Sequence, residues 1–332
     1  MNFGVIGYGY WGPNIVRNLS ALEGSQVLGI ADMSGPARMR AERAYPNIRV
    51  SPDPAEVLTS TKIDAVAIVS PVKSHYELAK AALLNGKHVF VEKPFTLNSA
   101  QGEELIELGL KRNLKIMVDH TFLFTGAVRK ISKMIDDGQL GKLYYYDSTR
   151  VNLGLLQHDV NVLWDLAPHD LSIMDYLIKG QPEAVVATGE KHVNEYEDVA
   201  YMTVYFPDKV IAHINVNWLS PVKVRMTLIG GEKRMVVWND LVADEKVRVY
   251  DRGVKATNHE GIYNLLINYR SGDMWAPRLE QVEALQQEMK YFVECIETGK
   301  DPINDGRAGV RIVKMLEAAT ASLANRGGLV YL

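Results

Sequence analysis

The sequence contains very little cysteine and no long hydrophobic run. Its 332 residues include one cysteine, Cys295, so no disulfide framework can form within the chain, and a cytoplasmic location is expected. No stretch of 18 apolar residues occurs, and the N-terminus does not read as a secretory signal. These absences exclude disulfide-stabilised small folds and predict that the chain does not associate with membranes.

An excess of positive charge is also missing. The 37 Lys and Arg residues against 40 Asp and Glu residues give a formal net charge of -3, so there is no basic field for nucleic acid. The apolar and charged fractions, 47% and 23%, are typical of globular proteins. A chain of this length predicts two domains, each with its own core.

The first part of the chain alternates short apolar runs with helix-length amphipathic segments. The runs are "FGVIG", "VLGIAD", "AVAIVS", "HVFVE" and "KIMVD". This alternation predicts a parallel sheet wrapped by helices, a Rossmann domain over residues 1–121. Helix signals lie between the runs, with Ser74 and Asn98 as expected N-caps and Asn85-Gly86 as a stop.

The pattern changes after about residue 140. Seven runs with period-2 alternation follow, from "LYYYDSTRVN" to "KVRVYD", with helices expected near 160–178, 279–297 and 306–325. Period-2 runs of this kind predict an open, mostly antiparallel sheet. We therefore expect an α/β protein with a C-terminal α+β domain over residues 122–332, which binds substrate and forms oligomer contacts.

A dinucleotide fingerprint occupies the N-terminus. Gly7-Tyr8-Gly9-Tyr10-Trp11-Gly12 matches G-x-G-x-x-G between a strand-like run and a helix-like segment that begins near Pro13. Asp32 ends the second apolar run, where a carboxylate accepts hydrogen bonds from the adenosine ribose. The acid favours NAD over NADP, although Ser34 and Arg38 leave NADP possible.

Two further positions carry chemistry. Lys93 follows the run "HVFVE", and ligands of open α/β sheets bind beyond the carboxyl ends of the strands. Pro94 after it restricts Lys93 toward extended geometry and allows a cis bond. Asp165 and His169 lie four apart on one face of an expected helix that contains Pro168. No third residue with metal-ligand spacing lies near this pair, so no metal is expected.

The fingerprint, Glu92-Lys93-Pro94 and the D-x-x-x-H helix together resemble the glucose-fructose oxidoreductase and inositol dehydrogenase (Gfo/Idh/MocA) family over nearly the whole chain. The resemblance implies that Lys93 orients the substrate and the nicotinamide and that His169 is the acid/base. It implies that Asp165 positions the substrate and the imidazole of His169. It implies homodimers or homotetramers through the open sheet. Its expected cofactor-contacting residues are Gly7, Gly9, Tyr10, Trp11, Gly12, Asp32, Ser70, Pro71, His75, Glu92, Lys93 and Pro94.

The substrate is expected from the same resemblance. The segment "STRVNLGLLQHDVNVLWDLAPHDLS" resembles the branch that oxidises nucleotide-linked sugars for surface polysaccharides, with C3 of UDP-N-acetylglucosamine as the expected position. Three alternatives stay open, namely a free sugar or polyol dehydrogenase, an NAD-dependent glycoside hydrolase and a non-catalytic NAD sensor. Residues that offer donors to sugar or phosphate oxygens are Arg150, Asn152, Gln157 and Asn161.

Overall fold

The computed structural model describes residues 1–154, 156–257 and 266–332, and it divides the chain into two compact units. The first unit comprises Met1–Phe124 and Val282–Lys314, and the second comprises Thr125–Gln281 and Met315–Leu332. The predicted domain boundary between residues 121 and 122 stays a prediction. The structure adds that a late segment of the chain packs with the N-terminal unit.

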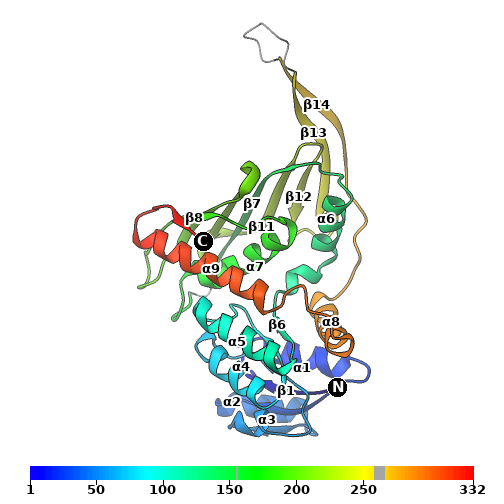
Figure 1. Cartoon of the computed structure of the whole chain (residues 1–332), viewed down its shortest axis with the longest axis vertical. Helices are drawn as coiled ribbons and strands as arrows, with labels where there is room; N and C mark the ends of the chain where they lie inside the picture. Colours follow the sequence, from blue (N-terminus) through cyan, green and yellow to red (C-terminus); the bar gives the residue numbers. More distant parts are fainter. Residues whose placement is uncertain (155, 258–265) are drawn as a thin grey trace. The chain divides into compact units, whose positions relative to one another are not determined.

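The first unit, whose N-terminal part is drawn from blue to cyan in Figure 1, is built on a parallel sheet of six strands in the order β3-β2-β1-β4-β5-β6. This confirms the predicted Rossmann sheet, and the strand order reverses between β1 and β4, where such folds bind ligands. The elements are β1 Asn2–Ile6, α1 Gly12–Ala21, β2 Gln26–Ala31, α2 Gly35–Ala44, β3 Arg49–Ser51, α3 Ala55–Leu58, β4 Ala65–Ile68, α4 His75–Leu84, β5 His88–Val91, α5 Ser99–Arg112, β6 Ile116–Val118 and α8 Ala284–Thr298.

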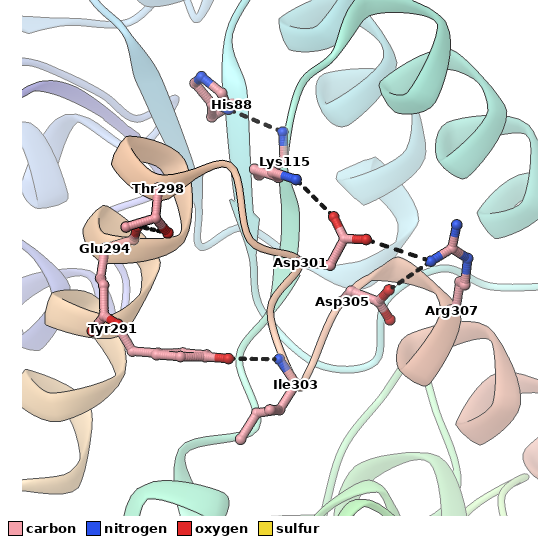
Figure 2. Close-up of polar contacts among 9 residues, drawn as sticks. All are labelled: His88, Lys115, Tyr291, Glu294, Thr298, Asp301, Ile303, Asp305 and Arg307. Carbon is pink, nitrogen blue, oxygen red and sulfur yellow. Dashed lines mark hydrogen bonds and ion pairs between the residues drawn. The ribbon is translucent and has the colours of Figure 1, made fainter.

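Helix α8 joins the first unit through aromatic and polar contacts. The ring centroid of Phe292 lies 6.4 Å from that of Phe3 on β1 and 5.9 Å from that of Phe90 on β5. Figure 2 shows the polar contacts that follow α8, where Lys115 Nζ lies 2.7 Å from Asp301 Oδ1 and the Ile303 amide donates to Tyr291 Oη at 3.2 Å. These contacts explain why residues far along the chain complete the N-terminal core.

The second unit contains a sheet of nine strands in the order β14-β13-β12-β11-β7-β10-β9-β8-β15. Neighbouring strands in this sheet pair antiparallel, except that β7 and β10 pair parallel. The predicted mostly antiparallel sheet is therefore confirmed. The elements are α6 Gly126–Asp136, β7 Leu143–Leu153, α7 Val162–Leu177, β8 Ala184–Glu190, β9 Val199–Tyr205, β10 Ile211–Asn217, β11 Leu219–Gly231, β12 Met235–Asn239, β13 Val247–Thr257, β14 Leu266–Trp275 and β15 Val330–Tyr331, with the boundary of the units inside α9 Gly306–Ala324.

One face of this sheet is core and the other is open, as the alternation predicts. On β10, Ala212, Ile214 and Val216 are fully buried, whereas Tyr201 and Tyr205 on the neighbouring β9 are exposed. Helix α7 packs against β7, β9 and β10. The helix that carries the predicted acid/base pair is therefore held by three strands.

Two expected helix caps have different outcomes. Asn98 caps α5 by accepting a hydrogen bond from the Gln101 amide, as predicted. Ser74 precedes α4 but makes no capping bond, which corrects the prediction, because a short 3₁₀ turn over Val72–Ser74 directs its hydroxyl to the carbonyl of Pro71. Across the described ranges, none of the helices has the length and apolar character needed to cross a membrane.

Candidate active site

The loop between β1 and α1 needs its glycines for different reasons. Gly7 has a φ of +103°, and a Cβ there would lie 2.3 Å from the carbonyl oxygen of Val69. A Cβ on Gly12 would lie 2.6 Å from the Gly7 carbonyl oxygen, whereas a Cβ on Gly9 would meet no heavy atom of the described residues within 4 Å. Gly7 and Gly12 therefore permit the tight turn, and Gly9 leaves its backbone open to a ligand.

A cavity of about 280 Å³ lies at the carboxyl ends of β1, β2 and β4. Its position at the reversal of strand order is where a dinucleotide binds in this type of sheet. The wall is largely apolar, which suits an adenine ring. It is lined by Ile6, Gly7, Gly9, Ala31, Asp32, Met33, Pro52, Pro54, Val69, Ser70, Pro71, Ser74 and Leu78.

Asp32 is held at this cavity by backbone donors. Its carboxylate accepts hydrogen bonds from the Tyr8 amide at 2.5 Å and the Ser34 amide at 2.7 Å, and it keeps lone pairs for ribose hydroxyls. Arg38 donates to the carbonyls of Asp32 and Met33, both at 2.9 Å. The nearby guanidinium is thus engaged by the backbone while the carboxylate lines the cavity, an arrangement that fits NAD better than a 2′-phosphate.

The aromatic residues of the fingerprint lie on the same loop. Tyr10 is 84% exposed and Trp11 is 48% exposed, and their rings meet edge to face with centroids 5.6 Å apart. Gly9, which lines the cavity, directly precedes Tyr10 and Trp11 in the chain. Cofactor contact by Tyr10 and Trp11 stays a prediction.

His75 ties the cavity to the lysine turn. Its buried ring lies between two carbonyl oxygens, with Nε2 2.8 Å from Ser70 O and Nδ1 2.9 Å from Pro94 O. Burial lowers the pKa of His75, and a neutral imidazole has one N–H, so it donates to one of the two carbonyls at a time. The Lys93–Pro94 bond is cis, the geometry that the sequence allows. His75 therefore links the backbone of Ser70, which lines the cavity, to the backbone of Pro94.

Three buried carboxyl groups form a cluster that includes Glu92, the residue before Lys93, and the other two were not predicted from the sequence. Glu92 follows β5, Asp119 follows β6, and Glu288 is on α8, with exposed fractions of 8%, 6% and 0%. Glu92 shares a hydrogen bond with Asp119, and Glu288 accepts from the His120 amide at 3.0 Å. A hydrogen bond between two carboxyl groups requires a proton, so this cluster is not fully ionised.

Burial sets the protonation of the cluster. Burial and the charge of Asp119 raise the pKa of Glu92 well above its usual value, opposed by Lys93. Burial likewise raises the pKa of Asp119 and of Glu288. His120 is 2% exposed, neither ring nitrogen has a hydrogen-bond partner among the described residues, and burial with the Lys93 charge lowers its pKa to about 3. Asp119 and His120 follow an apolar run, as Lys93 does. This position at the end of an expected strand is the feature of the sequence that could have identified them.

Helix α7 presents the predicted acid/base pair. Asn161 caps it by accepting from the Trp164 amide at 3.1 Å and donates to Glu197 at 2.9 Å. Asp165 lies in the first turn and accepts a hydrogen bond from the indole of Trp218 at 3.1 Å. His169 follows one turn later on the same face, and both are half-buried. The second unit thus holds a carboxylate and an imidazole together.

The predicted substrate ligands divide into two groups. The guanidinium of Arg150 is buried and binds Asp170 with two contacts, at 2.6 and 3.3 Å, and Asn161 is the helix cap. These roles inside the fold give no support to Arg150 or Asn161 as substrate ligands. Asn152 and Gln157 are half-buried, and substrate contact by them stays a prediction. Among the described residues, no three His, Cys, Asp or Glu side chains form a group that could hold a metal.

Comparisons with known proteins match both units. A family model described as "Oxidoreductase family, NAD-binding Rossmann fold" matches residues 1–120, and the "GFO/IDH/MocA C-terminal domain" matches residues 128–236. The chain is 26% identical to the scyllo-inositol 2-dehydrogenase (NAD(+)) of Bacillus subtilis, over 90% of this chain and 87% of that protein. It is 25% identical to the UDP-N-acetylglucosamine 3-dehydrogenase of Acidithiobacillus ferrooxidans, over 94% of each chain.

The fold is also found among solved structures. A structure of UDP-N-acetylglucosamine 3-dehydrogenase from Acidithiobacillus ferrooxidans superposes with a TM-score of 0.82 and 24% identity, covering 98% of each chain. An identity this low supports the fold and does not by itself identify a substrate.

Proposed function

Because the chain belongs to the Gfo/Idh/MocA oxidoreductase family, we propose that it moves a hydride between a secondary alcohol of a sugar ring and NAD. The substrate class that we favour is a UDP-linked N-acetyl sugar, oxidised at C3. One observation carries the proposal: the dinucleotide cavity is joined through Ser70 and His75 to the turn that holds Lys93.

The residues around the cavity fit the cofactor. Gly9 leaves room for a pyrophosphate, the start of α1 favours an anion, and Asp32 offers acceptors to the ribose. When bound, NAD accepts the hydride. The chain supplies the remaining chemistry, in which His169 takes the hydroxyl proton, Asp165 orients that imidazole, and Lys93 stabilises the developing alkoxide.

The substrate is tested by single-turnover absorbance of NADH. Enzyme and NAD are mixed at stoichiometric concentration with UDP-N-acetylglucosamine, its uronic acid, inositol or a free hexose, because an unfavourable equilibrium can limit the yield to one turnover. A burst with a UDP-sugar alone supports the proposal. A burst with inositol alone would replace it by the second candidate, a polyol dehydrogenase, which the similarity to the scyllo-inositol enzyme favours.

The assigned roles predict a defined kinetic outcome. Lys93→Ala and His169→Ala should each lower turnover by about 10²-fold to 10³-fold, since each removes one stabilising or proton-accepting group. NAD affinity, measured by calorimetry, should change little. Lys111→Ala, which alters an exposed lysine of the same unit, is the matched control and should keep the full rate. Full turnover by His169→Ala would remove the assigned base.

The location and the assembly are also part of the proposal. A cytoplasmic enzyme agrees with a single cysteine, which is buried. A homodimer or homotetramer through the open sheet is supported by the exposed aromatic side chains of β9, where Tyr201 stacks on His213 with ring centroids 6.4 Å apart.

A further inference from the structure

Trp218 is fixed in the second unit from several directions. It follows β10 directly, and its side chain is 2% exposed. Its amide donates to the carbonyl of Asp198 at 2.9 Å, and its carbonyl accepts from the Gly154 amide at 3.2 Å. Asp198 is itself anchored, because its buried carboxylate accepts from the His192 amide at 2.9 Å and lies 2.7 Å from His192 Nδ1. The indole therefore has little freedom to move.

The single polar atom of that indole is directed at the candidate site. Trp218 Nε1 donates to Asp165 Oδ2 at 3.1 Å, and an indole N–H is a donor only. The bond sets the rotation of the carboxylate about its last torsion, because one oxygen is fixed on the Trp218 side. His169 lies one helical turn beyond Asp165 on the same face. A donor at one oxygen thus decides where the carboxylate points relative to the imidazole.

We propose that Trp218 is a positioning residue for the reaction, whose indole N–H holds Asp165 in the orientation that supports His169. The inference rests on the proposed function, because it takes Asp165 and His169 as the acid/base pair. Trp218 acts only through Asp165, by fixing the orientation of its carboxylate, and it makes no bond to the reacting atoms.

Trp218→Phe keeps most of the buried ring and removes the N–H. Loss of one hydrogen bond to a charged group predicts a fall in kcat of about 10-fold to 100-fold. The affinity for NAD should be unchanged, and KM should change far less than kcat, since the lost bond acts on orientation during the chemical step.

The chain offers a matched control on the same helix. Trp164 also donates an indole N–H, to Thr320 Oγ1 at 3.0 Å. Trp164→Phe therefore makes the same substitution and loses an indole hydrogen bond, here to a neutral hydroxyl, without removing a partner of Asp165. It should keep its kcat within about twofold. An equal loss in both variants would mean that indole bonds support the fold generally, and this would overturn the inference.

A double variant isolates the pair. In an Asp165→Ala background, Trp218→Phe should lower kcat no further, because the bond partner is already absent. Additive losses would overturn the proposal. If Asp165→Ala is impaired while Trp218→Phe is fully active, this inference is wrong and the proposed function still holds. If Asp165→Ala is itself fully active, the acid/base assignment of the proposed function is wrong.

A spectroscopic test works without turnover. In the full-length protein labelled with ¹⁵N at tryptophan, the indole N–H resonance of residue 218, assigned with Trp218→Phe, should shift in Asp165→Asn. The indole resonance of Trp164 should stay in place. An unmoved Trp218 resonance would show that the bond is absent and would overturn the inference without any measurement of turnover.

Discussion

Two buried clusters of charged groups, one in each compact unit, are neutralised by different means. In the first, Glu92, Asp119 and Glu288 come together from three elements, and protons reduce their repulsion. In the second, Arg150 and Asp170 form a buried ion pair with two contacts. Protons respond to pH and a guanidinium does not, so the stability that the carboxyl cluster contributes should depend more on pH than that of the Arg150–Asp170 pair. The following predictions test that difference.

The largest effect is expected in the second unit. Arg150→Met leaves the buried carboxylate of Asp170 without its cation, and this should lower the free energy of unfolding by about 3–5 kcal/mol. Urea denaturation at pH 7 measures the loss. The double variant Arg150→Met/Asp170→Leu should recover much of it, because no uncompensated charge remains. A loss below about 1 kcal/mol in the single variant would contradict the ion pair as the means of neutralisation.

A pH-dependent effect is expected from Glu288→Gln. The folded pKa of Glu288 is raised, so its favourable contribution is full below the unfolded value near 4.5 and is lost as pH rises toward the folded pKa. Glutamine does not ionise, and the variant should lose less stability than the parent between pH 5 and 8. The difference is at most about 1.4 kcal/mol per pH unit.

The measurement is a set of urea midpoints across that pH range. Glu294→Gln, an exposed change on the same helix, is the matched control and should follow the parent. Parallel curves for Glu288→Gln and the parent would mean that Glu288 does not hold a proton in the folded state.

The smallest effect is expected on the acid side. The folded pKa of His120 is lowered to about 3, so the unfolded chain binds a proton there below about pH 6.5 while the folded chain does not. The parent should therefore lose stability as pH falls from 6.5 toward 5, and His120→Leu should lose less. Thermal unfolding at the two pH values tests this, with His158→Leu, an exposed position, as the comparison. If His120→Leu and the parent lose the same stability on acidification, His120 also binds a proton in the folded state, which contradicts the prediction.

Much of the fold could be predicted from local pattern. The strand runs before Asp32 and Lys93 are continuous and apolar because parallel strands are buried on both faces, and the alternation around Ala212 follows a sheet with one open face. The 3₁₀ turn at Ser74 was missed because serine can satisfy a carbonyl as readily as it caps a helix.

The site was predictable where chemistry sits in one motif. The glycine loop and Asp32 line one cavity because their spacing is set by one βαβ unit. Glu288 and Trp218 were missed because their partners come from remote segments. The ion pair of Arg150 with Asp170 was not predicted because a sequence does not indicate which carboxylate will pair with a guanidinium, and substrate contact by Arg150 stays a prediction. Long-range pairing of this kind leaves no local signal.

The place of β7 in the middle of its sheet has a consequence for how the chain folds. Its neighbours are β10 and β11, so Tyr145 faces Ile211 and Arg150 faces Arg225, and α7, β8 and β9 are synthesised before either partner exists. Contacts of such long sequence separation close slowly. During synthesis β7 keeps two unpaired edges until β10 and β11 have emerged, and unpaired strand edges of this kind favour aggregation of the nascent chain.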